Sequence, residues 1–182
     1  MEKSQNPAAV RSRGLLERAL LALMAERPYD EITVTALCER AQLGRKTFYR
    51  NYREKDDVLR VYIAALADGF LAALRPHAPF HDEVFARIMF SYWQPYAALF
   101  RLLRTSGGAV MMQQAFERVA AVVGEWFVCP EEIRDDEMFA RYCMSYVAGG
   151  CYAMLRDWLR GGAVQTPEQM AALFCRIRRL RA

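Results

Sequence analysis

Apolar residues recur with the spacing of an α-helix along almost the whole chain, and this repeat limits the possible folds more than any other feature. In the first segment they stand at positions 15, 16, 19, 20, 23 and 24, which share one face of a helix over about 9–26. No alternating apolar run is long enough to predict a sheet. We therefore expect an all-α fold of about nine helices.

Prolines and capping residues divide this pattern into separate helices. Pro28 and Pro76 each end a helix, because proline disfavours helical dihedrals in the residue before it. Thr33 can cap a second helix, and Thr166 with Gln169 has the spacing of a capping box. We predict helices over roughly 9–26, 34–41, 45–52, 54–74, 82–93, 95–104, 108–127, 134–160 and 167–180.

Composition narrows the class of protein. The chain has 182 residues, of which 54% are hydrophobic, so it can bury a core without disulfides or a structural metal. It has no uninterrupted apolar stretch of membrane-spanning length, and the polar N-terminus lacks a signal-peptide core. Its five cysteines are an odd number with no C-x-x-C spacing. We expect a cytoplasmic protein with reduced thiols and no cofactor or metal.

The positive charge is concentrated in one short segment. Between residues 42 and 53 there are four cations and no acid, although the whole chain carries a net charge of only +4. Threonine, tyrosine and asparagine are interleaved with Arg45, Lys46, Arg50 and Arg53, and such side chains bind phosphates and base edges. The segment 33–52 also has the size of a helix-turn-helix. Charge alone leaves two readings open, a DNA-reading helix and a basic surface helix without a partner.

The stretch from Ile32 to Leu59 resembles the DNA-binding head of the TetR family of transcriptional regulators. The matching residues are Thr33-Val34, Ala41, Thr47-Phe48-Tyr49, Tyr52, Lys55 with the two acids after it, and Val58-Leu59. The end of the chain, with Ala148-Gly149-Gly150, Trp158-Leu159-Arg160-Gly161-Gly162 and Thr166-Pro167-Glu168, looks like a C-terminal domain found in one group of these regulators. The resemblance implies a three-helix helix-turn-helix head over 1–54 and a helical ligand-binding and dimerisation bundle over 55–182.

The resemblance also implies which side chains contact DNA. They lie on the second and third helices and at the start of the fourth: Thr33, Thr35, Arg45, Lys46, Thr47, Tyr49, Asn51 and Lys55. The first two would bind phosphate, and residues 45–47 would face the major groove. Tyr49 and Asn51 would lie at the DNA backbone, and a base contact is the alternative for Asn51. Lys55 would hold a phosphate at the start of a helix, where the amide dipole favours an anion.

The head departs from the family pattern at two positions of the turn. The family usually has glycine where Gln42 stands and a small hydroxyl residue where Gly44 stands. If residue 42 adopts a left-handed conformation, glutamine costs about 1 kcal/mol there. Gly44 cannot cap the third helix with a side chain. These departures keep a rival reading open, in which the chain is an all-helical small-molecule binding or sensory protein whose head does not bind DNA.

The last two helices are the expected dimer interface. Ala148, Gly149, Gly150 and Ala153 would let another helix approach closely, and the family pattern is a four-helix bundle built from two subunits. The apolar residues expected to supply contact area are Phe139, Tyr146, Trp158, Leu173, Phe174 and Ile177. The alternative is that the glycines pack inside one subunit.

The middle helices are rich in methionine and aromatic residues, which in this family often line a cavity for an apolar or aromatic effector. The expected lining is Met89, Tyr92, Trp93, Tyr96, Phe100, Met112, Phe116 and Tyr142. Polar handles for a ligand are expected at Tyr92, Trp93, Tyr96, Arg104, Gln113 and Tyr142. The same residues could equally fill an ordinary helical core.

The sequence does not predict an enzyme. Its two histidines, His77 and His81, flank a loop that contains Pro79, and it contains no nucleophile elbow, phosphate-binding glycine loop or zinc-protease motif. We expect a dimeric regulator that binds a double-stranded DNA operator. A repressor is favoured over an activator, because repression needs only occupancy of a promoter. Its release by an effector would follow from a shift between two spacings of the heads.

Overall fold

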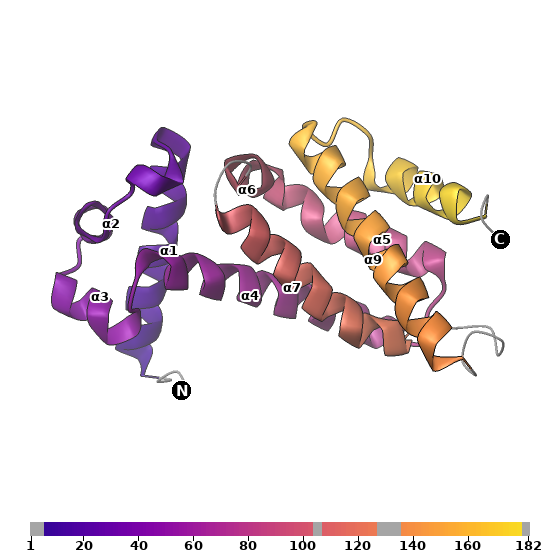
Figure 1. Ribbon diagram of the computed structural model, residues 1–182. Coiled ribbons are helices and arrows are strands. Elements are labelled where there is room, and N and C mark those ends of the chain that lie inside the picture. The colour runs from indigo at the N-terminus through magenta and orange to yellow at the C-terminus, as the bar shows by residue number, and fades with distance from the viewer. Residues whose placement is uncertain (1–5, 104–106, 127–135, 180–182) are drawn as a thin grey trace.

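The computed structural model describes residues 6–103, 107–126 and 136–179, and all of its regular structure is helical. This confirms the expected all-α class. Figure 1 shows helices α1 to α3 at one end and a bundle of the later helices at the other, with α4 running from the first group into the second. In the part of the chain that the structure describes, no helix is both long and apolar enough to cross a membrane.

The head consists of α1 (Pro7–Glu26), a 3-10 turn at Tyr29–Glu31, α2 (Val34–Ala41) and α3 (Arg45–Asn51). The expected start and stop signals are confirmed. Helix α1 ends before Pro28, and the Thr33 hydroxyl accepts a hydrogen bond from the Ala36 amide at 3.1 Å, which caps α2. Leu16 and Leu20 of α1, Leu37 of α2 and Phe48 of α3 are buried together as the core of this unit.

Helix α4 (Lys55–Leu74) has buried residues along its whole length. Val58 and Leu59 near its start belong to the buried core, as do Phe70 and Leu74 near its end. It contacts α1 in the head, and α5 and α7 in the bundle. The head and the bundle are thus joined by one packed helix rather than by a linker.

The bundle contains α5 (Asp82–Trp93), α6 (Ala97–Leu102), α7 (Gly107–Val123), α9 (Glu137–Arg160) and α10 (Pro167–Arg179). Short 3-10 segments lie at Arg75–His77, Gln94–Tyr96 and Gly124–Trp126. Two predicted helices are therefore shorter than expected: the one over 95–104 starts as a 3-10 turn that contains Pro95, and the one over 108–127 ends as a 3-10 turn.

Local capping signals also fix the last two helices. Asp136 caps α9 by accepting a hydrogen bond from the Phe139 amide at 2.9 Å. The predicted capping box of α10 is confirmed, since the Thr166 amide donates to Gln169 Oε1 at 2.9 Å and the Gln169 amide donates to Thr166 Oγ1 at 3.3 Å. Helix α10 packs on α5, where Arg178 Nε lies 2.9 Å from Asp82 Oδ2.

Two residues expected at a dimer interface are instead part of the subunit's own core. Trp158 and Phe174 are each only 5% exposed, because α9 and α10 turn these side chains toward α5, where they contact Phe90 and Phe85. The cysteines that the structure describes are free thiols, and Cys38 and Cys151 are buried. Cys129 lies outside the described residues.

Candidate nucleic-acid interface and ligand pocket

The turn between α2 and α3 is closed by backbone hydrogen bonds. The Leu43 amide donates to the Cys38 carbonyl at 2.9 Å, and the Gln42 amide donates to the Glu39 carbonyl at 3.1 Å. These two bonds form a Schellman motif, which requires a left-handed residue just after the helix. Gln42 takes that conformation, with φ of 54° and ψ of 40°. The condition under which the missing glycine carries a cost is therefore met, and the chain fills this left-handed position with glutamine.

Gly44 begins α3 without a side-chain cap. Its φ of −71° is open to any residue, and no atom lies within 4 Å of the position that a β-carbon would occupy. Its carbonyl accepts the Thr47 amide at 2.9 Å. The missing hydroxyl therefore leaves the path of the chain intact and leaves the first turn of α3 without a side-chain acceptor.

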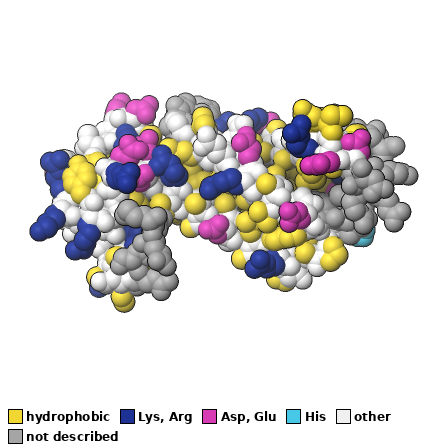
Figure 2. Space-filling model, turned by 60° about the horizontal axis from the view of Figure 1, so that its bottom comes forward, with side chains coloured by type: hydrophobic (Ala, Val, Ile, Leu, Met, Phe, Trp, Pro, Cys, Tyr) yellow, Lys and Arg dark blue, Asp and Glu magenta, His cyan; other side chains and the backbone are white. Residues whose placement is uncertain are grey.

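The outer face of α3 is strongly cationic. Arg45, Lys46 and Arg50 are exposed, as is Arg53 just beyond the helix, and none of the four forms an ion pair within the described residues. Figure 2 shows the dark-blue side chains gathered over the head end of the molecule. Unpaired cations on one short helix produce a positive potential that attracts the phosphates of DNA.

The remaining predicted DNA contacts lie on the same head, but three of them already form hydrogen bonds, the Thr33 hydroxyl as the cap of α2. Thr35 and Tyr49 are exposed, and Arg45 lies over the Tyr49 ring at 6.0 Å. Asn51 donates from Nδ2 to the Thr47 carbonyl at 2.8 Å. The Lys55 ammonium donates to the carbonyls of Tyr29 at 2.7 Å and Asp30 at 3.2 Å.

Lys55 is part of a connection that the sequence did not reveal. Its ammonium lies 4.5 Å from the centre of the Tyr29 ring, and the Tyr29 hydroxyl donates to Asp56 Oδ1 at 2.6 Å. Burial and the hydrogen bond to Asp56 raise the pKa of Tyr29 well above its usual value. The start of α4 is thereby tied to the 3-10 turn after α1. Only the acids after Lys55 and the aromatic residue after Pro28 hinted at this contact.

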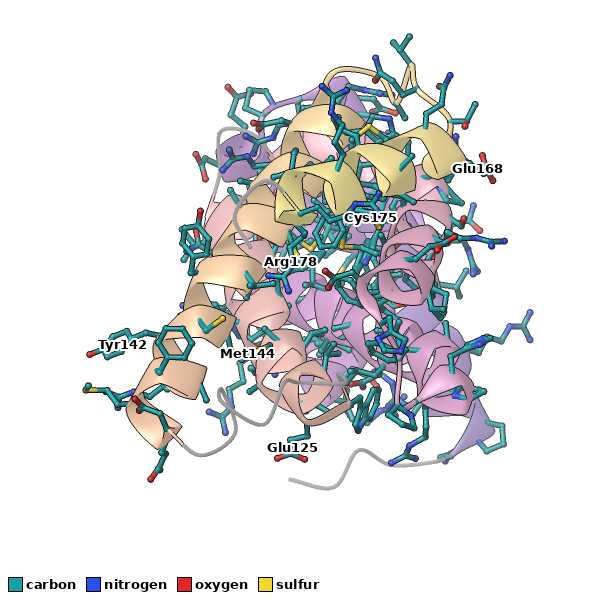
Figure 3. The ribbon with its side chains drawn as sticks, turned by 90° about the vertical axis from the view of Figure 1, so that its right-hand side faces the viewer. Glu125, Tyr142, Met144, Glu168, Cys175 and Arg178 are labelled. Atoms are coloured by element: carbon teal, nitrogen blue, oxygen red, sulfur yellow. The ribbon has the colours of Figure 1, made fainter. Side chains whose placement is uncertain are left out.

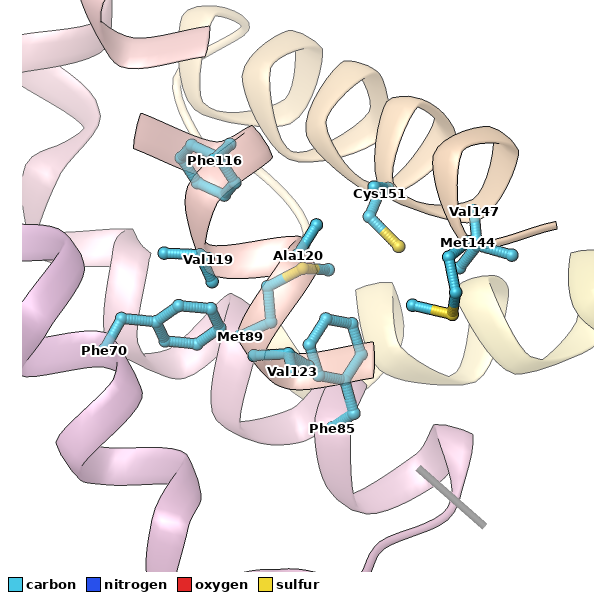
Figure 4. Close-up of a pocket in the computed structure, with 11 residues that line it drawn as sticks. Phe70, Phe85, Met89, Phe116, Val119, Ala120, Val123, Met144, Val147 and Cys151 are labelled. Atoms are coloured by element: carbon cyan, nitrogen blue, oxygen red, sulfur yellow. The ribbon is translucent and has the colours of Figure 1, made fainter. Parts of the chain in front are cut away.

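Four helices enclose an apolar pocket in the bundle (Figure 4). Its volume is about 420 Å³, including the open space at its mouth. The lining residues, all apolar, come from α4, α5, α7 and α9: Phe70, Phe85, Met89, Phe116, Val119, Ala120, Val123, Met144, Val147, Ala148 and Cys151. Burial raises the pKa of the Cys151 thiol to about 12, so the wall strongly disfavours an ionised group.

The structure brings two of the eight expected lining residues, Met89 and Phe116, to this pocket. The rest lie elsewhere: most pack in the aromatic core beside it, whereas Tyr142 is 61% exposed on α9 and points away from the bundle (Figure 3). Gln113 donates to Glu117 on the surface of α7, and Arg104 lies outside the described residues.

Sequence reasoning missed the α9 wall of the pocket. Met144, Val147, Ala148 and Cys151 follow one another at steps of three, one and three, which is the spacing of a single helix face. That spacing was available in the sequence. The aromatic residues of α9 do not follow this face, so a search for aromatic side chains does not find it.

The comparisons with known proteins agree with this arrangement. A model described as "Bacterial regulatory proteins, tetR family" matches residues 16–62, and one described as "Transcriptional regulator C-terminal region" matches residues 83–179. The HTH-type transcriptional regulator TcmR of Streptomyces glaucescens is 34% identical over 64 residues, which are 35% of this chain and 28% of TcmR. The chain thus spans less than a third of the length of that curated relative.

Solved structures show the same fold at low identity. The fatty acid degradation regulator FadR from Bacillus halodurans matches with a TM-score of 0.69 and 15% identity, covering 94% of each chain. A TetR-family transcriptional regulator from Syntrophomonas wolfei gives a TM-score of 0.67 at 14% identity, covering 92% of this chain and 93% of that one. Because the C-terminal model alone matches more than half of the residues and the head model matches the helix-turn-helix, this chain belongs to the TetR family of transcriptional regulators.

Proposed function

We propose that this DNA-binding regulator is a dimeric repressor that leaves its operator when a small apolar effector fills the bundle pocket. The observation that carries the proposal is the exposed, unpaired cationic face of α3, which the left-handed turn at Gln42 orients. Regulators of this family are DNA-binding factors rather than enzymes, which agrees with the absence of a catalytic motif from the sequence. A repressor must reach chromosomal DNA, so we propose that it works in the cytoplasm.

The predicted DNA contacts divide into two groups by what they would read. Arg45, Lys46 and Thr47 stand in the first turn of α3 and would meet base edges in the major groove. The other five, Thr33, Thr35, Tyr49, Asn51 and Lys55, would contact the DNA backbone. Lys55 has one ammonium proton left for a phosphate after its two bonds to backbone carbonyls.

Selection of bound duplexes from a random pool, followed by fluorescence anisotropy, tests this division. Arg45→Ala should relax the ranking of sequences, whereas Tyr49→Ala should weaken all duplexes alike. Arg118→Ala, on α7, is the matched control that removes an exposed cation far from the head and from the proposed α9 interface. A head that ignores every duplex even at low salt would instead support the rival reading, a sensory protein without DNA binding.

We further propose that a second copy of the chain covers the outer face of α9. Met138, Phe139 and Tyr142 are 65%, 53% and 61% exposed, and Gly149 and Gly150 continue the same face. No atom lies within 4 Å of the place where a β-carbon would stand at either glycine, so another helix can approach closely there. On α10, Leu173 and Ile177 are also exposed, at 43% and 41%.

Sedimentation measurements test the dimer. Phe139→Asp and Gly150→Asp should convert the protein to a monomer and abolish specific operator binding, since one head reads too few base pairs. Val10→Asp alters an equally exposed apolar residue on α1 and should leave the dimer intact. A wild-type protein that sediments as a monomer at micromolar concentration would contradict the proposed interface.

Helix α4 supports the proposed link between ligand and DNA. Phe70 near its end lines the pocket, whereas Lys55 at its start holds the head by two backbone carbonyls. A ligand that favours one position of α4 would bias the spacing of the two heads, and operator binding would oppose ligand binding to the same extent. A ligand that binds tightly and leaves operator affinity unchanged would contradict this mechanism.

That the protein represses transcription, and does not activate it, is part of the proposal. The dihydroxyacetone kinase operon activator DhaS shares this fold, with a TM-score of 0.61 and 14% identity over 91% of this chain and 93% of that one, so the fold itself is compatible with activation. Transcription from a selected operator in a purified system would decide it. We also propose that the DNA-binding domain ends at residue 54 and that α4 is the first helix of the regulatory domain.

A further inference from the structure

A tryptophan with an unpartnered N–H lies beside the pocket. Trp93 is 1% exposed, and its indole Nε1 finds no hydrogen-bond acceptor among the described residues. The indole of Trp158, by contrast, donates to the Gln165 carbonyl at 3.1 Å. Buried tryptophan N–H groups usually have a partner, because leaving such a donor without one is unfavourable.

Helix periodicity puts Trp93 next to the pocket. Phe85 and Met89, four residues apart on α5, both line it, and Trp93 is the next residue on that face. The Trp93 ring packs against two further wall residues, with centroids 5.0 Å from Phe116 and 5.8 Å from Phe70. Trp93 therefore lies directly behind these two phenylalanines, outside the lining itself.

The lining of the pocket contains no polar side chain other than the Cys151 thiol, which burial keeps protonated. The half-buried Tyr92 and Tyr96 also pack against the Trp93 ring, outside that lining. An ionised ligand would lose its hydration there without gaining a counter-charge. A neutral molecule with a single acceptor would lose little and would satisfy the indole N–H.

We propose that the pocket binds an uncharged apolar molecule with one carbonyl-type oxygen, and that Trp93 Nε1 donates a hydrogen bond to this oxygen. The inference rests on the proposed effector function and specifies its ligand. The apolar body fills the space between α5, α7 and α9, and the oxygen reaches the indole when the Phe116 ring turns aside. Trp93 thus determines specificity, whereas the rest of the wall provides contact area.

Three probes of nearly equal shape test this assignment by titration calorimetry: 2-acetylnaphthalene, 2-ethylnaphthalene and 2-naphthoate. A two-ring hydrocarbon body matches the apolar side chains that line the pocket. The ketone should bind about five- to tenfold more tightly than the hydrocarbon, which is the ratio expected for one net hydrogen bond. The carboxylate should bind more weakly than either.

Two matched variants locate the donor. Trp93→Phe should remove the preference for the ketone and retain binding of the hydrocarbon, whereas Trp158→Phe should keep the preference, because that indole donates to Gln165 elsewhere in the bundle. Equal binding of ketone and hydrocarbon by the wild type would overturn the role of Trp93 and leave the effector pocket standing. Tightest binding of the carboxylate would also overturn it. Failure of all three probes would overturn the pocket as well.

If Trp93→Phe does not fold, nuclear magnetic resonance of the indole N–H signals in the wild-type protein tests the same hydrogen bond. The chain has three tryptophans, so Trp126→Phe and Trp158→Phe identify the Trp93 indole signal by elimination. That signal should move downfield with the ketone and stay nearly in place with the hydrocarbon. An unchanged signal in a protein that has bound the ketone would refute the hydrogen bond.

Discussion

Replacing Gln42 with glycine should make the protein more stable, because residue 42 is left-handed in the turn before α3. A left-handed conformation costs a non-glycine residue about 1–2 kcal/mol, whereas the greater freedom of glycine in the unfolded chain costs about 0.5–1 kcal/mol. The Gln42 side chain is exposed, so its removal loses no packing. The midpoints of these two ranges leave a net expected gain of about 0.75 kcal/mol, or about 1.5–3 °C in Tm for a chain of this size.

Urea unfolding followed by circular dichroism measures this gain, at one fixed protein concentration because dimerisation also adds stability. Gln42→Ala is the first control: it removes the same side chain but keeps the left-handed strain, so it should show no gain. Ala163→Gly is the second, since Ala163 also has a positive φ, of 52°, but lies between α9 and α10. It should stabilise the protein without changing operator affinity. Equal stability of Gln42→Gly and Gln42→Ala would refute the reasoning.

Three further predictions concern helix α4 and the pocket. Gly69→Ala should destabilise the protein, because the new β-carbon would collide with the Tyr92 hydroxyl, which donates to the Leu66 carbonyl. In a Tyr92→Phe background the same substitution should instead stabilise the protein by up to about 1 kcal/mol, because alanine has a higher helix propensity than glycine. Thermal melts of the wild type, the two single variants and the double variant test this reversal. Lys55→Gln should lower the free energy of unfolding by about 1 kcal/mol, whereas Lys46→Gln should not, which urea titrations would show. Burial raises the pKa of Cys151 to about 12 from 9.0, so the stability that the buried thiol contributes is complete below pH 9 and is lost as the pH rises toward 12. Cys151→Ala should therefore lose less stability than the wild type between pH 9 and 12. An identical decline in the two proteins would contradict this prediction.

The sequence predicted those parts of the fold that depend on neighbouring residues. The cap at Thr33 and the capping box of Thr166 and Gln169 join residues three apart, so their chemistry can be read from the order of residues alone. The connection between Tyr29 and the start of α4 could not be read in this way. It joins groups 26 and 27 residues apart, and it exists only because α1 and α4 pack together.

The same limit explains the outcome at the pocket. Helical spacing shows which residues share a face, but the direction of that face depends on the helices that pack against it. Phe116 and Tyr142 both looked suitable for a cavity, yet α7 turns the first inward and α9 turns the second toward solvent. Trp158 was mistaken for an interface residue for the same reason, since nothing near it in the sequence reveals its contact with Phe90.

Because helix α4 is continuous, the number of residues in it sets the angle at which the head is rotated relative to the bundle. An α-helix turns by about 100° and rises about 1.5 Å per residue, so one residue inserted near the middle of α4 would rotate the recognition helix to a different side of the molecule. Seven inserted residues would nearly restore the angle while lengthening the rod by about 10 Å. Chimeras that exchange heads between members of this family should therefore be spliced in register within α4, or outside it altogether.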